Sequence, residues 1–166
     1  MRGWGHEDED EIFPGGVDPV DRFSRKSGMA DKTVSGSCLC STVRYEISGN
    51  LGIFQYCHCS RCRKFTGSAH SANLLVRPEQ FRWLSGEEAI GRYEPPESRH
   101  FATVFCRNCG SSMPWLGKSG RAVVVPAGTL DEHPGIEPMQ NVFWASRAAW
   151  YREAGELPRF EELPLK

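Results

Sequence analysis

The stretch Phe105-Cys-Arg-Asn-Cys-Gly110 is the strongest local signal in this sequence. Its two cysteines stand three positions apart, a spacing at which a tight turn directs both sulfur atoms to one point. The glycine that follows suits a backbone with positive φ and lets amide groups approach the thiolates. One such turn supplies two of the four ligands that a tetrahedral zinc ion takes. The stretch therefore predicts half of a zinc site, with the other half elsewhere in the chain.

Cys38-Leu-Cys40 is the natural second pair, and it precedes a predicted strand. A disulfide between two cysteines with one residue between them would close a small, strained ring, but both sulfurs can reach one metal ion. A site that joins this pair to Cys106 and Cys109 would close a long loop of chain. We therefore predict a structural four-cysteine zinc site. The alternative is that these cysteines act as small buried apolar side chains.

Cys57-His-Cys-Ser-Arg-Cys62 places three more cysteines, Cys57, Cys59 and Cys62, in one short stretch. Three protein ligands and one open position are typical of a catalytic zinc ion, and soft sulfur ligands favour zinc. An ion with three thiolate ligands is a weak Lewis acid, better suited to deprotonating a thiol than to activating water. We therefore predict that these three cysteines form the catalytic site.

Three alternatives stand beside this interpretation. His58 or His70 could supply a fourth ligand and make the second site structural, although His58 lies between two ligands and its side chain is expected to point away. The three cysteines could be redox-active without a metal. An iron–sulfur cluster fits least well, because it usually takes four cysteines.

Arg61, Arg63 and Lys64 surround Cys62 on a predicted helical turn. Their positive charge would offset the negative charge of the thiolates and lower the pKa values of nearby thiols. The same side chains could bind a carboxylate of the substrate or cofactor; the alternative is a solvated basic turn. Thr66-Gly67-Ser68 then predicts a tight bend at the end of the helix.

The remaining histidine and aromatic residues are assigned from their residue type alone. His100 and His133 have no partner visible in the sequence, so we expect structural or surface roles for them. Aromatic residues in a β domain more often belong to the core than to a pocket. Four of them could nevertheless line a pocket near the second site: Trp115, Phe143, Trp144 and Trp150.

The composition limits the possible classes of protein. The chain of 166 residues has 20 basic and 21 acidic residues, a formal net charge of −1, which indicates neither a nucleic-acid partner nor an anionic membrane. No apolar run approaches the roughly 20 residues of a membrane span, and no signal region is visible at the N-terminus. A cytoplasmic protein with reduced cysteines is expected. The seven cysteines are an odd number, which argues against a pure disulfide framework. Nothing in the sequence indicates an oligomeric state.

Residues 1–33 differ from the rest of the chain. They contain the acidic run Glu7-Asp-Glu-Asp-Glu11 and show neither helical nor strand periodicity, so we expect a disordered or extraneous N-terminal extension. Met29 begins a segment that resembles an ordinary protein start, and residues 1–28 are a candidate upstream extension. The alternative is a partner-binding tail. Residues 34–166 are then expected to form one zinc-binding domain.

The domain is predicted to be mainly β, built of short antiparallel strands with few short helices. Glycine and proline interrupt segments rich in β-branched and aromatic residues. Ser60–Phe65 and Ala145–Glu153 are the predicted helices, the second with Ser146 as a possible cap. The predicted strands are Thr42–Ser48, Ile53–Tyr56, Ser71–Val76, Phe81–Leu84, Ala89–Tyr93, His100–Phe105 and Ala122–Pro126.

Taken together, the motifs resemble the glutathione-dependent formaldehyde-activating enzyme family, which includes the centromere protein V type domain. The resemblance covers about residues 34–163. It rests on three cysteine motifs in order and on two C-terminal segments: Gly36-Ser-Cys-Leu-Cys40, Cys57-His-Cys-Ser-Arg-Cys-Arg-Lys-Phe-Thr-Gly-Ser68, Phe105-Cys-Arg-Asn-Cys-Gly110, Ser146-Arg-Ala-Ala-Trp-Tyr151 and Leu157-Pro-Arg-Phe160.

The resemblance implies a fold of two sheets that lean together like a tent, with one structural and one catalytic zinc ion. By motif match, the four cysteines at 38, 40, 106 and 109 correspond to the structural site, and Cys57, Cys59 and Cys62 to the catalytic site. The implied activity is condensation of glutathione with formaldehyde to S-(hydroxymethyl)glutathione, a carbon–sulfur lyase reaction in reverse. The partners implied are therefore a small thiol, glutathione as co-substrate, and a small carbonyl compound.

The resemblance does not identify the carbonyl substrate or a general acid. In the resulting hypothesis, the glutathione thiolate occupies the open position beside the three cysteines and meets an aldehyde held close to it. A related lyase that acts on another small molecule is one alternative. A non-enzymatic, zinc-stabilised module that binds glutathione, another thiol or a protein partner is the other.

Overall fold

The computed structural model describes residues 32–153, 155 and 157–163. The expected N-terminal extension covers residues 1–33, of which residues 1–31 lie outside the described residues. The first described strand begins at Thr33, next to the proposed boundary. In the described ranges, no helix is both long enough and apolar enough to cross a lipid bilayer.

Short strands dominate the described chain, which confirms the mainly β prediction. The one α-helix of this part, α1 (Ser60–Thr66), lies in the connection between the third and fourth strands. The other helical segments are single 3₁₀ turns: η1 (Pro78–Gln80), η2 (Glu87–Ala89), η3 (Ala127–Thr129) and η4 (Trp144–Ser146). The strands are β1 (Thr33–Ser37), β2 (Arg44–Ser48), β3 (Ile53–Cys57), β4 (Ser71–Val76), β5 (Phe81–Ser85), β6 (Ile90–Tyr93), β7 (Thr103–Cys106), β8 (Trp115–Leu116), β9 (Val123–Pro126) and β10 (Gln140–Val142).

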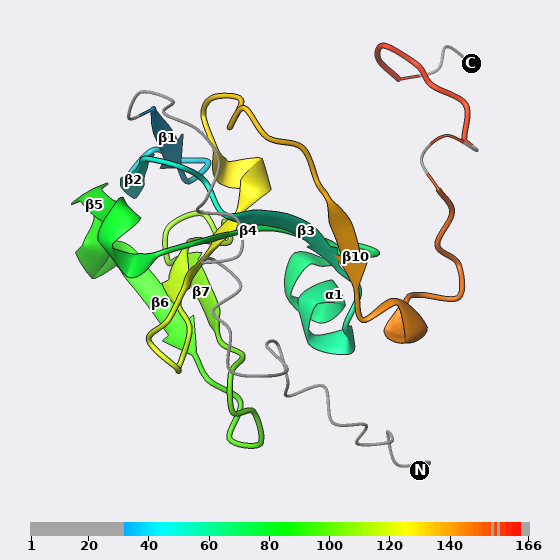
Figure 1. The fold of residues 1–166 in the computed structure, drawn as a ribbon, viewed down its shortest axis with the longest axis horizontal. Helices are drawn as coiled ribbons and strands as arrows, with labels where there is room; N and C mark the ends of the chain where they lie inside the picture. The colour runs from blue at the N-terminus through cyan, green and yellow to red at the C-terminus, as the bar shows by residue number, and fades with distance from the viewer. Residues whose placement is uncertain (1–31, 154, 156, 164–166) are drawn as a thin grey trace.

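Hydrogen bonding divides these strands into three sheets. The largest has the order β10-β3-β4-β9-β8, a second contains β1-β2-β5, and β6 pairs with β7. Neighbouring strands are antiparallel except for β10, which runs parallel to β3 in the described pairs. Figure 1 shows the β1-β2-β5 sheet on one side and α1 with β10 on the other, with β3 and β4 running between them. The mainly β arrangement is therefore present, with the β6-β7 pair as a third sheet.

The central sheet has two faces of different chemistry. Successive side chains of a strand point to opposite faces, so Phe54 of β3 and its cross-strand partner Leu74 share one face. Both side chains belong to the main apolar core, which also contains Tyr45 and Ile47 of β2. The alternating pattern of β2 buries these two residues and leaves its other positions more exposed. The opposite face of the central sheet is left to carry the residues of the site.

Strand positions matched the sequence expectations better than the C-terminal segment did. Each of the seven predicted strands overlaps an observed one, and the predicted helix Ser60–Phe65 matches α1. Three short strands were missed, namely β1, β8 and β10. The predicted helix Ala145–Glu153 is wrong, because the chain makes only the single turn η4 and Arg147 then adopts an extended ψ of 153°.

Candidate metal centres

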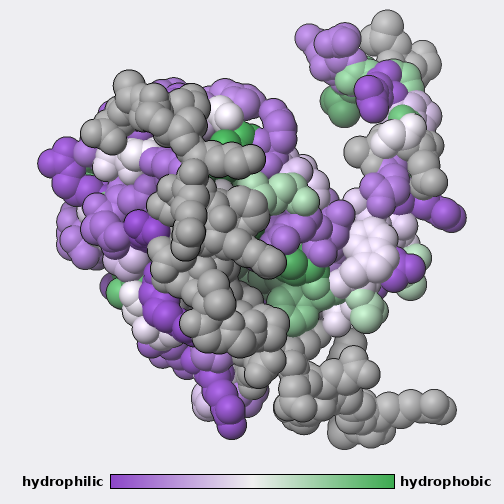
Figure 2. Space-filling model, viewed as in Figure 1, coloured by the Kyte–Doolittle hydropathy of each residue, from purple (hydrophilic) through white to green (hydrophobic). Residues whose placement is uncertain are grey.

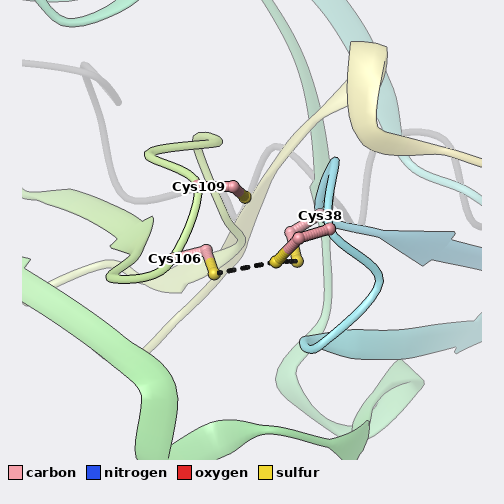
Figure 3. Close-up of side chains that lie close together, drawn as sticks. Cys38, Cys106 and Cys109 are labelled. Carbon is pink, nitrogen blue, oxygen red and sulfur yellow. Dashed lines mark hydrogen bonds between the residues drawn. The ribbon is translucent and has the colours of Figure 1, made fainter.

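The four-cysteine group joins two segments that are far apart in the sequence. Cys38 follows β1, and Cys106 ends β7. The turn after Cys106 closes with a 2.8 Å hydrogen bond from the Gly110 amide to the Cys106 carbonyl, and Gly110 has the expected positive φ of 77°. Figure 3 shows Cys106 and Cys109 facing Cys38 across the gap between the two segments. The spacing therefore produces the turn that the sequence predicted.

Distances within this group fit ligands of one ion. The Sγ atoms of Cys38 and Cys40 are 3.5 Å apart, and those of Cys40 and Cys106 are 3.9 Å apart. Sulfurs bound about 2.3 Å from a tetrahedral zinc ion would lie about 3.8 Å from each other. All four ligand atoms, Cys109 included, lie within 4.8 Å of one another. The four cysteines could therefore hold one metal ion.

Neighbouring polar groups favour the thiolate form of Cys40 and Cys109, whereas burial raises the pKa of the Cys106 thiol to about 11. The Val43 amide donates to Cys38 Sγ over 3.3 Å. A side-chain hydrogen bond with Ser111 is the main cause that lowers the pKa of the Cys109 thiol to about 5. A hydrogen bond with Thr42 likewise lowers the pKa of Cys40. The thiolates that these contacts favour are suitable ligands for a cation.

The three-cysteine group is local and buried. Cys57 is the last residue of β3, Cys59 is the N-cap of α1 and Cys62 lies in the first turn of α1. The Cys62 amide donates to Cys59 Sγ over 3.3 Å, so one sulfur caps the helix. The three sulfur atoms lie within 4.8 Å of one another. A strand that ends directly before a capped helix therefore gathers three sulfurs at one point.

Hydrogen bonds among the three sulfurs make their proton affinities unequal. Bonds from Cys57 and Cys62 lower the pKa of the Cys59 thiol, because they stabilise its thiolate. The same bonds, with burial, raise the pKa values of Cys57 and Cys62. A bound cation would stabilise the thiolate form of all three sulfurs.

The histidine between these cysteines points away from them, as predicted. His58 is fully buried, and its Nε2 atom lies 2.9 Å from Asn141 Oδ1. Its ring packs edge-on against Trp144, with centroids 4.9 Å apart, and lies near the ring of His70. Neither group of sulfurs includes a histidine nitrogen from the described residues. Closure of the second site by His58 or His70 is therefore wrong for this part of the chain.

A cavity of about 50 Å³ opens beside the three cysteines. The cysteines also touch an apolar cluster that includes Phe101, Phe65 and Phe143. Figure 2 shows apolar surface over α1, within a face that is otherwise largely hydrophilic. Further apolar lining comes from Leu75, Trp115 and Val124. The second group therefore faces a small, mostly apolar space, whereas the first does not border this cavity.

Sequence reasoning identified only part of this lining. Trp115 and Phe143 line the cavity, but Trp144 and Trp150 are not among its lining residues. His100 does line it, although the sequence suggested only a structural or surface role.

The basic turn contributes one residue to the cavity. Arg61 is half-buried and lines the space, whereas Arg63 and Lys64 are not among the lining residues. Lys64 is exposed at the last turn of α1, and the Nε atom of Arg63 is buried. Thr66 donates to the Cys62 carbonyl over 2.9 Å and Gly67 ends the helix with φ of 63°, which is the predicted bend.

Polar residues on the sheet were missed by the sequence analysis. Gln55, Asn73 and Ser98 line the cavity and are buried. Gln55 stands two positions before Cys57, so period-two alternation places both on one face of β3. The alternation along β3 could have indicated Gln55 from the sequence. The position of Asn73 follows only from the pairing of β3 with β4.

A family model described as glutathione-dependent formaldehyde-activating enzyme matches residues 33–146. The chain belongs to this family. The matched range begins with β1, ends with η4 and contains both cysteine groups, so the family assignment rests on the described domain.

Two further likenesses accompany the family match. An uncharacterized lyase of Schizosaccharomyces pombe is 28% identical over 87 residues, which are 52% of this chain and 59% of that protein. The chain thus matches less than two thirds of this relative's own length. The crystal structure of a Rhodobacter sphaeroides protein is similar with a TM-score of 0.50 and 21% identity, over 64% of this chain and 98% of that chain. The second likeness shows a shared fold.

Zinc fits the donor sets that this family member presents. Both groups consist of cysteine sulfur alone, and the described cysteines are free thiols. Soft sulfur donors select zinc over hard cations such as magnesium or calcium. The first group offers a complete set of four ligands, and the second offers three beside a cavity.

Proposed function

We propose that this protein is a zinc-dependent carbon–sulfur lyase-type enzyme. It would join the thiol of glutathione to formaldehyde or a related small carbonyl compound and catalyse the reverse cleavage. The observation that carries the proposal is the group of three buried sulfurs, Cys57, Cys59 and Cys62, at the edge of an apolar cavity. The family assignment and the lyase relative support the same chemistry.

Two zinc ions per chain belong to this proposal. The ligands of the structural ion are Cys38, Cys40, Cys106 and Cys109, and those of the catalytic ion are the three buried cysteines. When bound at the second site, zinc would keep a substrate thiol deprotonated near neutral pH. A cytoplasmic location, where thiols stay reduced, suits both sites.

The protein's own residues would position the reactants. The sulfur of the thiolate adds to the carbonyl carbon, a carbon–sulfur bond forms, and the π electron pair moves to oxygen, which takes up a proton. The cavity walls, Phe101, Trp115 and Phe143 among them, would exclude water and hold the aldehyde close to the sulfur. A cavity of about 50 Å³ favours a carbonyl compound of few atoms.

Glutathione carries two carboxylates, and the basic turn of α1 is the proposed site for them. Arg61 is the residue of this turn that reaches the cavity. Arg63 and Lys64 follow on the same short helix, outside the cavity lining. We assign the carboxylate nearer the cavity to Arg61, because carboxylates pair with Arg in bidentate fashion. The carboxylate farther from the cavity is assigned to Arg63 and Lys64.

Exchange spectroscopy by NMR on mixtures of glutathione and formaldehyde tests the proposal. The protein with both sites loaded should speed the exchange between free and condensed glutathione, and Cys62→Ser should abolish the acceleration. Metal analysis of the same samples should give two zinc ions for the wild type and one for the variant. If the fully loaded wild type leaves the rate unchanged for formaldehyde and other small aldehydes, the enzyme proposal fails, and a thiol-binding module remains.

A further inference from the structure

Two buried amide side chains stand side by side in the cavity. Gln55 of β3 and Asn73 of β4 are directly paired across the two strands, so their side chains share the face that also carries Cys57. Both line the cavity, and they are only 7% and 8% exposed. Side chains of this polarity are seldom so buried unless each of their polar atoms has a partner.

Each amide oxygen has a partner. The Ser71 hydroxyl donates to Asn73 Oδ1 over 2.7 Å. Gln140 Nε2 of the neighbouring strand β10 donates to Gln55 Oε1, also over 2.7 Å. These bonds fix the orientation of both amides, because their acceptor ends are held by the protein.

The amide nitrogens are the groups left over. Among the described residues, neither Asn73 Nδ2 nor Gln55 Nε2 has a hydrogen-bond partner. Both side chains line the cavity, so these NH₂ groups remain available to a ligand there. Two donors on one wall of a small cavity indicate a ligand atom that accepts from both. The acceptor chemistry that matches two NH₂ groups is an oxygen with partial or full negative charge.

The surroundings make these donors effective. Leu75 and Val124 flank the amides on the same face, and Phe101 and Trp115 complete the apolar wall. In such a space, water competes weakly, and a hydrogen bond to a developing charge is stronger than in bulk solvent. Gln55 and Cys57 are two residues apart on one strand, roughly 7 Å between Cα atoms. The amides and the cysteine sulfurs therefore line one cavity from neighbouring positions.

We propose that Gln55 and Asn73 bind the carbonyl oxygen of the aldehyde and stabilise its negative charge while the thiolate adds. As sulfur forms its bond to carbon, the electron pair of the C=O bond moves to the oxygen that both amides face. The amides donate hydrogen bonds and give up no proton; the proton released by the glutathione thiol balances the alkoxide. This inference rests on the proposed function and adds the two residues that bind the carbonyl oxygen, with that oxygen pointing toward the sheet.

The test replaces each NH₂ by an oxygen without changing shape. Asn73→Asp and Gln55→Glu keep the acceptors for Ser71 and Gln140 and remove the donors. We expect each change to lower kcat for the condensation by about 10²-fold or more, the usual effect of removing one such donor. The affinity for glutathione alone, measured by calorimetry, and the zinc content should stay near the wild-type values. The thermal midpoint should fall by a few degrees, because each change places a carboxyl group in a buried position.

Asn50→Asp is the matched control. Asn50 is exposed in the turn between β2 and β3, so this substitution adds the same charge away from the cavity. It should retain full activity. The two test variants change different strands, so if one variant fails to fold, the other still tests the inference. If the wild type is active and both variants stay within about threefold of it, the inference is wrong and the proposed function stands. If the wild type itself is inactive, both fail.

Discussion

The two cysteine groups offer the same sulfur donors in different structural settings. Cys40 and Cys106 in the first group are 66 residues apart, and this group ties the β1-β2 hairpin to the β6-β7 pair. In the second group, Cys57 and Cys62 belong to one short stretch, and the group borders the cavity. A cross-link between distant segments restricts the unfolded chain, whereas a local one restricts it little. The first group is therefore suited to stability and the second to chemistry.

Cys109→Ser should have the largest effect on stability. Its side chain is only partly buried, so little packing is lost and the change mainly removes one ligand of the first site. Binding of a structural zinc contributes about 10–16 kcal/mol in small domains, against a total stability of about 5–15 kcal/mol. We expect loss of the cooperative thermal transition and of both zinc ions, measured by calorimetry and metal analysis. A normal melting curve with one zinc lost would contradict the structural role.

Gly36→Ala tests whether packing near the first group matters as well as metal. A methyl group at Gly36 would meet the Tyr45 ring and lie 2.7 Å from the Thr129 carbonyl oxygen. Forcing an atom into such a space costs about 1–3 kcal/mol. The thermal midpoint should fall by several degrees while two zinc ions remain. Gly128→Ala is the control, because a methyl there meets nothing within 4 Å.

Cys62→Ser should have a smaller effect on stability and a decisive one on activity. The change leaves the first site intact and places a hydroxyl in a buried position, which costs about 1 kcal/mol. We expect one zinc ion per chain, a thermal midpoint within a few degrees of the wild type, and no accelerated condensation. If this variant melted as early as Cys109→Ser, both groups would be structural, and the proposed difference between them would be wrong.

Sequence spacing was sufficient for each cysteine turn because the geometry of each turn is local. The turn at Cys106 and Cys109 and the cap at Cys59 each depend on a few neighbouring residues, so motif and structure agree. The joining of two distant pairs came from ligand counting, which needs four sulfurs for a closed site.

The cavity was largely hidden from sequence analysis because it depends on strand register. The pairing of Gln55 with Asn73 follows from long-range hydrogen bonding, which a single strand's alternation does not specify. Parallel β10 brings Gln140 beside Gln55 from a segment of three residues with little strand character. The C-terminal helix failed for a related reason, since tertiary contacts of Trp144 with His58 replaced local helical propensity.

The smallest effect is expected from removing residues 1–28, which we propose lie outside the domain. Lys32 is the first described residue, and its carbonyl accepts from the Gly49 amide over 3.0 Å while its Nζ donates to the His133 carbonyl. A chain that starts at Met29 keeps these bonds and all of β1, so zinc content, thermal midpoint and condensation rate should equal those of the full chain.

A longer N-terminal truncation, which also removes part of β1, is the control for the chain that starts at Met29. A chain that starts at Ser35 loses Lys32 and the fully buried Val34, which pairs with Ile47 in the β1-β2 hairpin just before Cys38. Burying a valine side chain contributes about 1.5–3 kcal/mol, so this shorter chain should melt earlier and hold zinc at the first site less tightly. If the chain from Met29 already lost zinc or folded stability, the upstream residues would be part of the four-cysteine region. The domain boundary would then have to move toward the N-terminus.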